Sequence, residues 1–253
     1  MRDIHSSVII GENTIIDCEK VTIGKYSRIG NNVKIQCKEL IIGNHLYMAD
    51  GVEIGRGGNR GPNSKVKIGN GPVEIGDNCG IGADVMIWTH GAWLDITKGF
   101  PSEFGPVKIG NDVWLPARSI VLPNVVVGNN VVIGTNSLVN KSLPDGCLAA
   151  GIPCKVIKEN IYPKTLDDTQ IESMVNGILS DWKVLCEHKG ITRNIETNYK
   201  NRRIFLNQSN FKTIYNIDDR TIEGHTNDVS EDLRDYLRRR GIKIYADRFF
   251  KSI

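Results

Sequence analysis

Long apolar runs are missing from this 253-residue sequence, which has no segment near the roughly 18–20 consecutive apolar residues that a membrane span requires. Its start, MRDIHSSVIIGEN, lacks the basic and then apolar layout of a secretory signal peptide, so we expect a cytoplasmic protein. CxxC pairs are also missing, which disfavours structural zinc and a disulfide framework. We expect reduced thiols at all six cysteines, which are Cys18, Cys37, Cys79, Cys147, Cys154 and Cys186.

An excess of one charge is lacking too. The sequence has 32 basic and 29 acidic side chains, a formal net charge of +3, and neither sign gathers in one part of the chain. Without a concentrated basic face we expect no nucleic-acid partner. The hydrophobic share of 40% is enough for one large or two modest domains.

What the sequence does contain is an aliphatic residue at every sixth position. These anchors extend back to Ile10, with steps of seven at 16→23 and 35→42, and in residues 106–139 they are Ile109, Leu115, Val121, Val127, Ile133 and Val139. The period matches neither the 3.6 of a helix nor the 2 of an ordinary strand. It predicts a short strand and a corner per six residues, with Gly or Asn taking the corner dihedrals. Three strands would close a triangular coil, and coils would stack as parallel strands roughly 4.8 Å apart.

Three segments, IGNDVW (109–114), VVVGNNVVIGTNSLVNKSLPDG (125–146) and AAGIPCKVIKE (149–159), resemble the hexapeptide-repeat acyltransferases, in particular the galactoside, maltose and sialic-acid O-acetyltransferases. The resemblance implies a mostly β fold with a left-handed parallel β-helix over residues 1–160. It implies acetyl-coenzyme A as acyl donor and a sugar or glycan hydroxyl of a surface polysaccharide as acceptor. It also implies a homotrimer with sites between neighbouring subunits.

The frame is interrupted by an insertion that we expect to form an external loop over residues 88–107, and His90 lies at its start. Acyl transfer needs a base that takes the acceptor's proton near neutral pH, and imidazole has a matching pKa. The resemblance makes His90 the general base of a direct transfer without an acyl-enzyme. Which group orients the imidazole stays open between Asp95, Glu103 and a backbone carbonyl.

Further site residues follow from the same resemblance. Near the arm and phosphates of the coenzyme it places Trp114, Ala117, Arg118, Gly134, Ser137, Lys141, Lys155 and Lys158. In the loop we expect Trp93 and Asp95 to contact the acceptor. Phe100 and Phe104 are expected to form the loop's own small core.

After residue 160 the six-residue frame ends, and residues 161–253 predict a small α+β appendage. Apolar residues at helical spacing predict a helix over 166–188 that stops at Gly190. Strands are predicted over 202–208, 211–217, 220–224 and 242–247, and a second helix is predicted to begin with Ser230 as its N-cap.

Other functions remain open on the sequence. N-acetylation of a nucleotide-linked amino sugar would use the same machinery. A γ-type carbonic anhydrase on the same coil needs three histidine ligands, and no second histidine accompanies His90, so we expect no metal. A non-catalytic β-helix scaffold would show ladders of one outward residue type, which the sequence lacks.

Overall fold

The computed structural model describes residues 1–55, 71–191 and 194–244, and it divides into two units, Met1–Lys164 and Thr165–Ile253. The insertion between Ile54 and Ile75 lies mostly outside the described residues. None of the described helices is long and apolar enough to cross a membrane.

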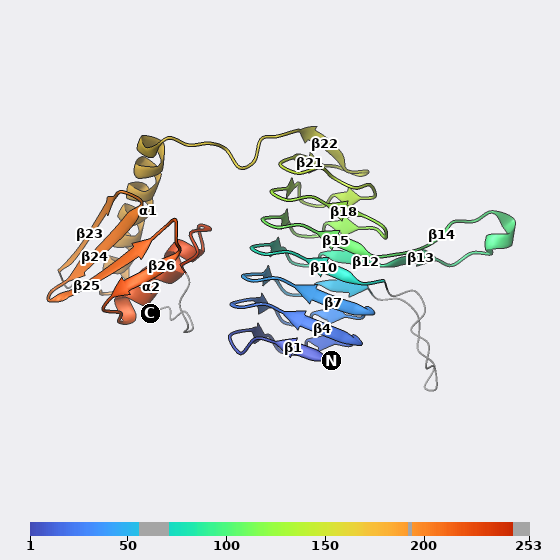
Figure 1. Ribbon diagram of the computed structural model, residues 1–253, viewed down its shortest axis with the longest axis horizontal. Coiled ribbons are helices and arrows are strands. Elements are labelled where there is room, and N and C mark those ends of the chain that lie inside the picture. The colour runs from blue at the N-terminus through green and yellow to red at the C-terminus, as the bar shows by residue number, and fades with distance from the viewer. Residues whose placement is uncertain (56–70, 192–193, 245–253) are drawn as a thin grey trace. The chain divides into compact units, whose positions relative to one another are not determined.

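Short strands in three sheets build the first unit (Figure 1). The first sheet contains β1 (Arg2–Ile4), β4 (Lys20–Ile23), β7 (Glu39–Ile42), β10 (Val73–Ile75), β15 (Val107–Ile109) and β18 (Val126–Val127). The second contains β2 (Ile9–Ile10), β5 (Arg28–Ile29), β8 (Tyr47–Met48), β11 (Gly80–Ile81), β16 (Trp114–Leu115), β19 (Val132–Ile133), β21 (Leu148–Ala150) and β22 (Lys155–Lys158). The third contains β3 (Ile15–Ile16), β6 (Lys34–Ile35), β9 (Glu53–Gly55), β12 (Met86–Trp88), β17 (Ile120–Val121) and β20 (Leu138–Val139).

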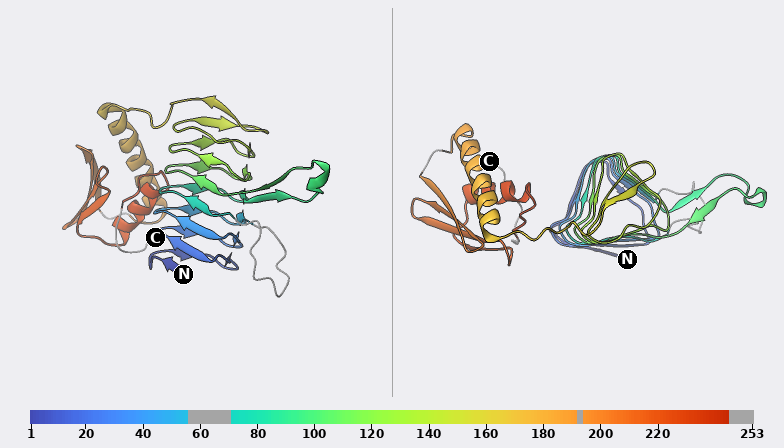
Figure 2. Two further views of the ribbon diagram at one scale, coloured as in Figure 1. Left: turned by 45° about the vertical axis from the view of Figure 1, so that its right-hand side comes forward. Right: turned by 90° about the horizontal axis from the view of Figure 1, so that it is seen from above.

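The chain visits the three sheets in turn, and their strands pair in parallel from one coil to the next; of the described strands in these sheets, only β22 runs antiparallel, against β21. Seen from above, the sheets form the sides of a triangle (Figure 2). The predicted parallel β-helix is therefore confirmed.

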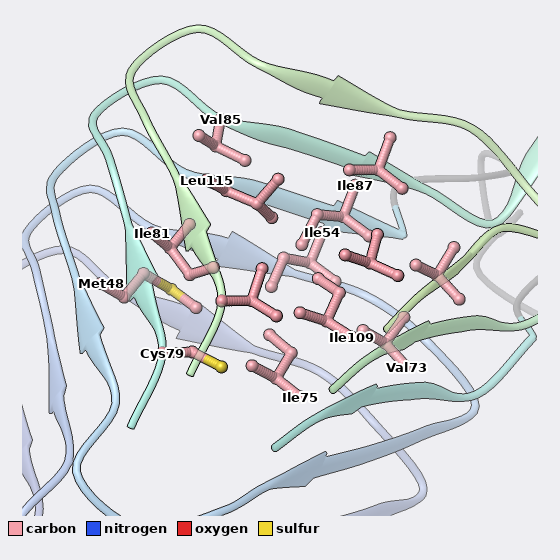
Figure 3. Close-up of a cluster of buried hydrophobic side chains, with 14 of the residues drawn as sticks. Met48, Ile54, Val73, Ile75, Cys79, Ile81, Val85, Ile87, Ile109 and Leu115 are labelled. Atoms are coloured by element: carbon pink, nitrogen blue, oxygen red, sulfur yellow. The ribbon is translucent and has the colours of Figure 1, made fainter. Parts of the chain in front are cut away.

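The anchors fill the inside of the triangle, as Figure 3 shows for Met48, Ile54 and Ile87. Every anchor from Ile23 to Val139 is at most 2% exposed. The first anchor, Ile10, is 42% exposed, because its strand β2 pairs with a neighbouring coil on one side only. Continuous burial of anchors between stacked coils is the main apolar stabilisation of this unit.

The corners differ from the prediction in one respect. The left-handed dihedrals fall three residues after the anchor, on residues such as Asn32, Asn78 and Asn130, whereas among the described glycines that directly follow an anchor only Gly55 has a positive φ. The other glycines at this position are needed for a different reason, as Gly76 shows: a methyl group there would lie 2.8 Å from the carbonyl carbon and oxygen of Gly110 in the next coil. Close stacking of coils, not backbone conformation, selects glycine there.

The insertion after β12 forms an antiparallel hairpin, β13 (His90–Ala92) and β14 (Ser102–Phe104), with the 3₁₀ turn η1 (Ile96–Lys98) at its tip. This hairpin arm projects sideways from the β-helix (Figures 1 and 2). The predicted small core of the arm is wrong, since Phe100 and Phe104 are both exposed. A two-stranded hairpin with no layer behind it has no interior in which to bury them.

The second unit has its own core, made by two helices and a four-stranded antiparallel sheet. Its elements are α1 (Asp168–His188), β23 (Ile195–Lys200), β24 (Arg203–Gln208), β25 (Phe211–Asn216), β26 (Thr221–Gly224) and α2 (Asp228–Arg238). No strand was predicted at β23, because its sequence, IETNYK, is largely polar.

Two expectations for this unit need correction. The N-cap of α2 is Asn227, whose side-chain oxygen accepts from the Ser230 amide at 2.9 Å, while the Ser230 hydroxyl accepts from the Asn227 amide at 2.7 Å. Ser230 thus closes a capping box from inside the helix. The predicted strand 242–247 is absent over 242–244, and its remaining residues lie outside the described ones.

Candidate functional site

His90 stands at the corner where the chain leaves the third sheet, as the first residue of the hairpin arm. It is half-buried, and its Nδ1 lies 3.2 Å from the carbonyl oxygen of Gly55 in the preceding coil. A carbonyl oxygen can only accept, so this hydrogen bond requires the proton of the neutral imidazole to be on Nδ1. Nε2 then carries a lone pair, which is the state of a general base. Among the described residues, the hydrogen-bond partner of the imidazole is thus a backbone carbonyl and not the carboxylate of Asp95 or Glu103.

Gly55 is held firmly in position by its neighbours. Its φ is +82°, and an added methyl group would lie 2.1 Å from the carbonyl oxygen of Gln36 and 3.2 Å from Cβ of Cys37. Its carbonyl oxygen also accepts from the hydroxyl of Thr89, at 3.3 Å, and Thr89 is fully buried. The acceptor for the imidazole is therefore a rigid part of the coil, and only glycine fits there.

Aromatic rings lie on two sides of the imidazole. The centroid of the Trp88 ring is 5.6 Å from that of His90 at an interplanar angle of 46°, and Phe104, which pairs with His90 across the arm, is 6.4 Å away at 28°. These contacts restrict the rotation of the imidazole. The sequence analysis missed both Gly55 and Trp88, although the six-residue frame stacks the anchors Ile54 and Ile87 and so places the two residues side by side.

Trp93 and Asp95 lie at the tip of the arm, beyond its paired residues, while His90 lies at its base. The Asp95 carboxylate caps η1, accepting from the amide and the hydroxyl of Thr97 at 3.0 and 2.7 Å. Trp93 is 94% exposed. Within one chain, neither residue is brought to the imidazole.

Trp114 begins β16 on the second sheet, with its side chain 56% exposed. A methyl group added at Gly80, the residue paired with it in the coil before, would lie 3.5 Å from Cδ1 of Trp114. The indole thus leans over a position that carries no side chain. This leaves a flat aromatic face open to solvent on the second sheet.

Four predicted coenzyme contacts lie together at the corner between the second and third sheets. Ala117 and Arg118 occupy it in one coil, and Arg118 is exposed with its Nε 3.9 Å from the carboxylate of Asp84. Gly134 and Ser137 occupy it in the next. The Ser137 side chain is buried, and its hydroxyl donates to the Gly134 carbonyl at 2.7 Å and accepts from the Gly151 amide at 3.0 Å. The Ser137 hydroxyl therefore makes its hydrogen bonds to the backbone within this corner.

The three predicted phosphate-binding lysines are all exposed. Lys141 lies at the same corner as His90, and Lys155 and Lys158 lie on β22 at the edge of the second sheet. Within one chain the predicted site residues therefore lie in separate places: at two corners, on the second sheet and at the tip of the arm. Among the described residues, no group of three His, Cys, Asp or Glu side chains gathers in a way that could hold a metal ion.

Two family models match the β-helix: the bacterial transferase hexapeptide (six repeats) over residues 106–141, and the hexapeptide repeat of succinyl-transferase over residues 72–92. Galactoside O-acetyltransferase of Escherichia coli is 35% identical over 117 residues, which cover 45% of this chain and 58% of that protein. The putative lipopolysaccharide biosynthesis O-acetyl transferase WbbJ of E. coli is 46% identical over 57 residues, 22% of this chain and 29% of that protein.

The chain thus spans little more than half the length of the galactoside enzyme. Among solved structures, the polySia specific acetyltransferase NeuO is 22% identical, with a TM-score of 0.42 over 76% of this chain and 98% of that one. The two matched models lie within the β-helix and carry its six-residue period, so residues 72–92 and 106–141 are similar to the repeats of hexapeptide transferases.

Proposed function

We propose that the protein is an acetyl-coenzyme-A-dependent acetyltransferase that acts on a sugar or glycan hydroxyl. The observation that carries the proposal is the hydrogen bond from Nδ1 of His90 to the Gly55 carbonyl, because it leaves the Nε2 lone pair available for a proton. The names of the related galactoside and lipopolysaccharide enzymes support a sugar acceptor.

The reaction would be a direct transfer. As the acceptor oxygen attacks the thioester carbonyl, its proton passes to Nε2 of His90. The resulting imidazolium still donates a hydrogen bond from Nδ1 to the Gly55 carbonyl oxygen. The tetrahedral intermediate then collapses, the carbon–sulfur bond breaks, and the departing thiolate takes the proton from Nε2. No side chain needs to carry the acetyl group.

A second copy of the chain would complete the site, in a homotrimer. This is supported by the separation of His90 from the exposed Trp114, which lie on different sides of the triangle within one chain. The outward residues of the second sheet include Tyr47, 46% exposed and separated from Trp114 in the ladder by Gly80 alone. Aromatic residues exposed in one row are suited to contact with a coenzyme arm and a neighbouring subunit. The cations for the phosphates of the coenzyme would come from Arg118 and from the exposed Lys141, Lys155 and Lys158.

The test compares two variants at one position. His90→Asn retains a side-chain N–H about where Nδ1 is, and so retains the donor to the Gly55 carbonyl, but it removes the base. We expect kcat for thiol release from acetyl-coenzyme A to fall about 10²–10⁴-fold, with coenzyme affinity and thermal stability close to wild type. In His90→Ala, kcat should fall by the same factor, and the hydrogen bond to the Gly55 carbonyl should be lost as well.

The acceptors tested would be sugars, oligosaccharides and amino sugars. Treating the product with alkali would distinguish an ester, which is hydrolysed, from an amide, which is stable. Near-normal turnover by His90→Asn would remove the imidazole from the mechanism. A stable amide product would replace the hydroxyl acceptor by an amine and leave the role of His90 intact.

A further inference from the structure

Two thiols face each other at the same corner as His90, in the first two coils. Sγ of Cys18 lies 3.4 Å from Sγ of Cys37. The hydrogen bonds that flank the pair, from the Asp17 amide to the Ile35 carbonyl at 2.8 Å and from the Glu19 amide to the Lys38 carbonyl at 3.0 Å, hold the two residues opposite each other. The spacing of about 4.8 Å between parallel strands falls inside the Cα–Cα range of about 4.4–6.8 Å that disulfides adopt.

The remaining cysteines offer a contrast. Burial raises the pKa of the Cys147 and Cys154 thiols, and it raises the pKa of Cys186 to about 11, so these three hold little thiolate at neutral pH. Cys79 is buried, with its Sγ 3.1 Å from the Gly110 carbonyl oxygen. Cys18 is the one cysteine of the six that is partly exposed. An oxidant in solution should therefore meet Cys18 first.

We propose that Cys18 and Cys37 form a reversible redox site that closes to a disulfide with hydrogen peroxide. The sulfur of Cys18, as thiolate, attacks the peroxide bond and forms a sulfenic acid, and the hydroxide released becomes water by taking a proton. The sulfur of Cys37 then displaces the sulfenic oxygen as a second water and gives up its own proton. In total, two thiols and one peroxide give one disulfide and two waters. The accessible thiol reacts first and the buried one resolves it.

The position of this pair suggests a consequence for His90, and this second step rests on the proposed function. Cys37 and Gln36 are the residues against which Gly55 is packed, at 3.2 Å and 2.1 Å from the place of its missing methyl group. The Gly55 carbonyl in turn holds Nδ1 of His90. Closing the disulfide draws the two sulfurs together by roughly 1.4 Å, from the contact distance to bond length. This displaces the support of Gly55 and loosens the orientation of the imidazole.

The chemistry is tested on the full reduced chain, treated with peroxide, alkylated and digested. We expect a mass lower by two hydrogens, a linked peptide pair that contains Cys18 and Cys37, and reversal by dithiothreitol. Cys18→Ser and Cys37→Ser should give no linked pair, and Cys186→Ser should behave as wild type. Sulfinic acid at Cys18 without a linked pair, or a link between other cysteines, would overturn the proposal.

The coupling has two readouts. Oxidation should lower kcat about 10-fold, less than the ~10² that a 1 Å misplacement of a reacting group can cause, and Cys18→Ser should keep its full activity after peroxide. Independently of turnover, the ring signals of His90 in NMR should shift between the reduced and oxidised forms. A linked pair with unchanged His90 signals would refute the coupling alone, whereas a reduced chain with no transferase activity would refute the proposed function and leave the dithiol chemistry standing.

Discussion

Replacing Gly55 by alanine tests how the coil holds the imidazole. The residue has a φ of +82°, where a β-carbon is disfavoured by about 1–2 kcal/mol. The new methyl group would also lie 2.1 Å from the Gln36 carbonyl oxygen, so one coil must move, and overpacking of this kind costs about 1–3 kcal/mol. The free energy of unfolding should fall by about 2–5 kcal/mol, which corresponds to a melting temperature lower by about 5–15 °C.

Gly91→Ala is the matched control. Gly91 follows His90 directly, its φ is not positive, and a methyl group there would meet no atom within 4 Å. We expect its melting temperature to change by the equivalent of about 1 kcal/mol or less, since the only clear effect is on the unfolded chain. Both variants would be measured by thermal denaturation followed by circular dichroism, and by thiol release from acetyl-coenzyme A.

Gly55→Ala should also lower kcat in the protein that remains folded, because the displaced carbonyl no longer aligns Nδ1 of His90. Gly91→Ala should retain activity. If the two variants had equal melting temperatures, the close packing of Gly55 against the coil before it would be refuted. A stable, fully active Gly55→Ala protein would refute the role of this carbonyl in orienting the base.

The proposed trimer predicts that sedimentation at micromolar concentration gives three copies of the 28.1 kDa chain, and a monomer would contradict it. Burial raises the pKa of Cys186 to about 11, while the thiol of an unfolded chain titrates near 8.5. Its contribution to the stability of the second unit is therefore complete below pH ~8.5 and is lost as the pH rises toward 11. In Cys186→Ala the free energy of unfolding, measured by chemical denaturation, should therefore fall less between pH ~8.5 and 11 than in the wild type. An equal fall in both proteins would contradict the assignment.

The orientation of His90 is the clearest limit of the sequence analysis. The resemblance pointed to His90, but it left the choice between Asp95, Glu103 and a backbone carbonyl open. Asp95 and Glu103 are nearby in sequence, yet Asp95 caps the arm's own turn. The orienting oxygen belongs to Gly55, 35 residues earlier, and reaches His90 because the coils stack. A backbone acceptor leaves no signature in residue type, so only the register of the coils reveals it.

The fold of the first unit was determined by the sequence itself, since each anchor needs only its own six-residue frame and the next coil to be buried. Positions such as Ile54, Ile87 and Val121 could be assigned without a long-range contact, and the structure buries all three. Wherever a choice depended on what one coil presents to the next, tertiary structure decided it. This holds for the need for glycine at Gly76, the inward turn of the Ser137 hydroxyl and the meeting of Cys18 with Cys37. The physical reason is that periodicity specifies which side of a strand faces inward, while atomic contacts between coils join residues about 14–35 positions apart, beyond the reach of local pattern.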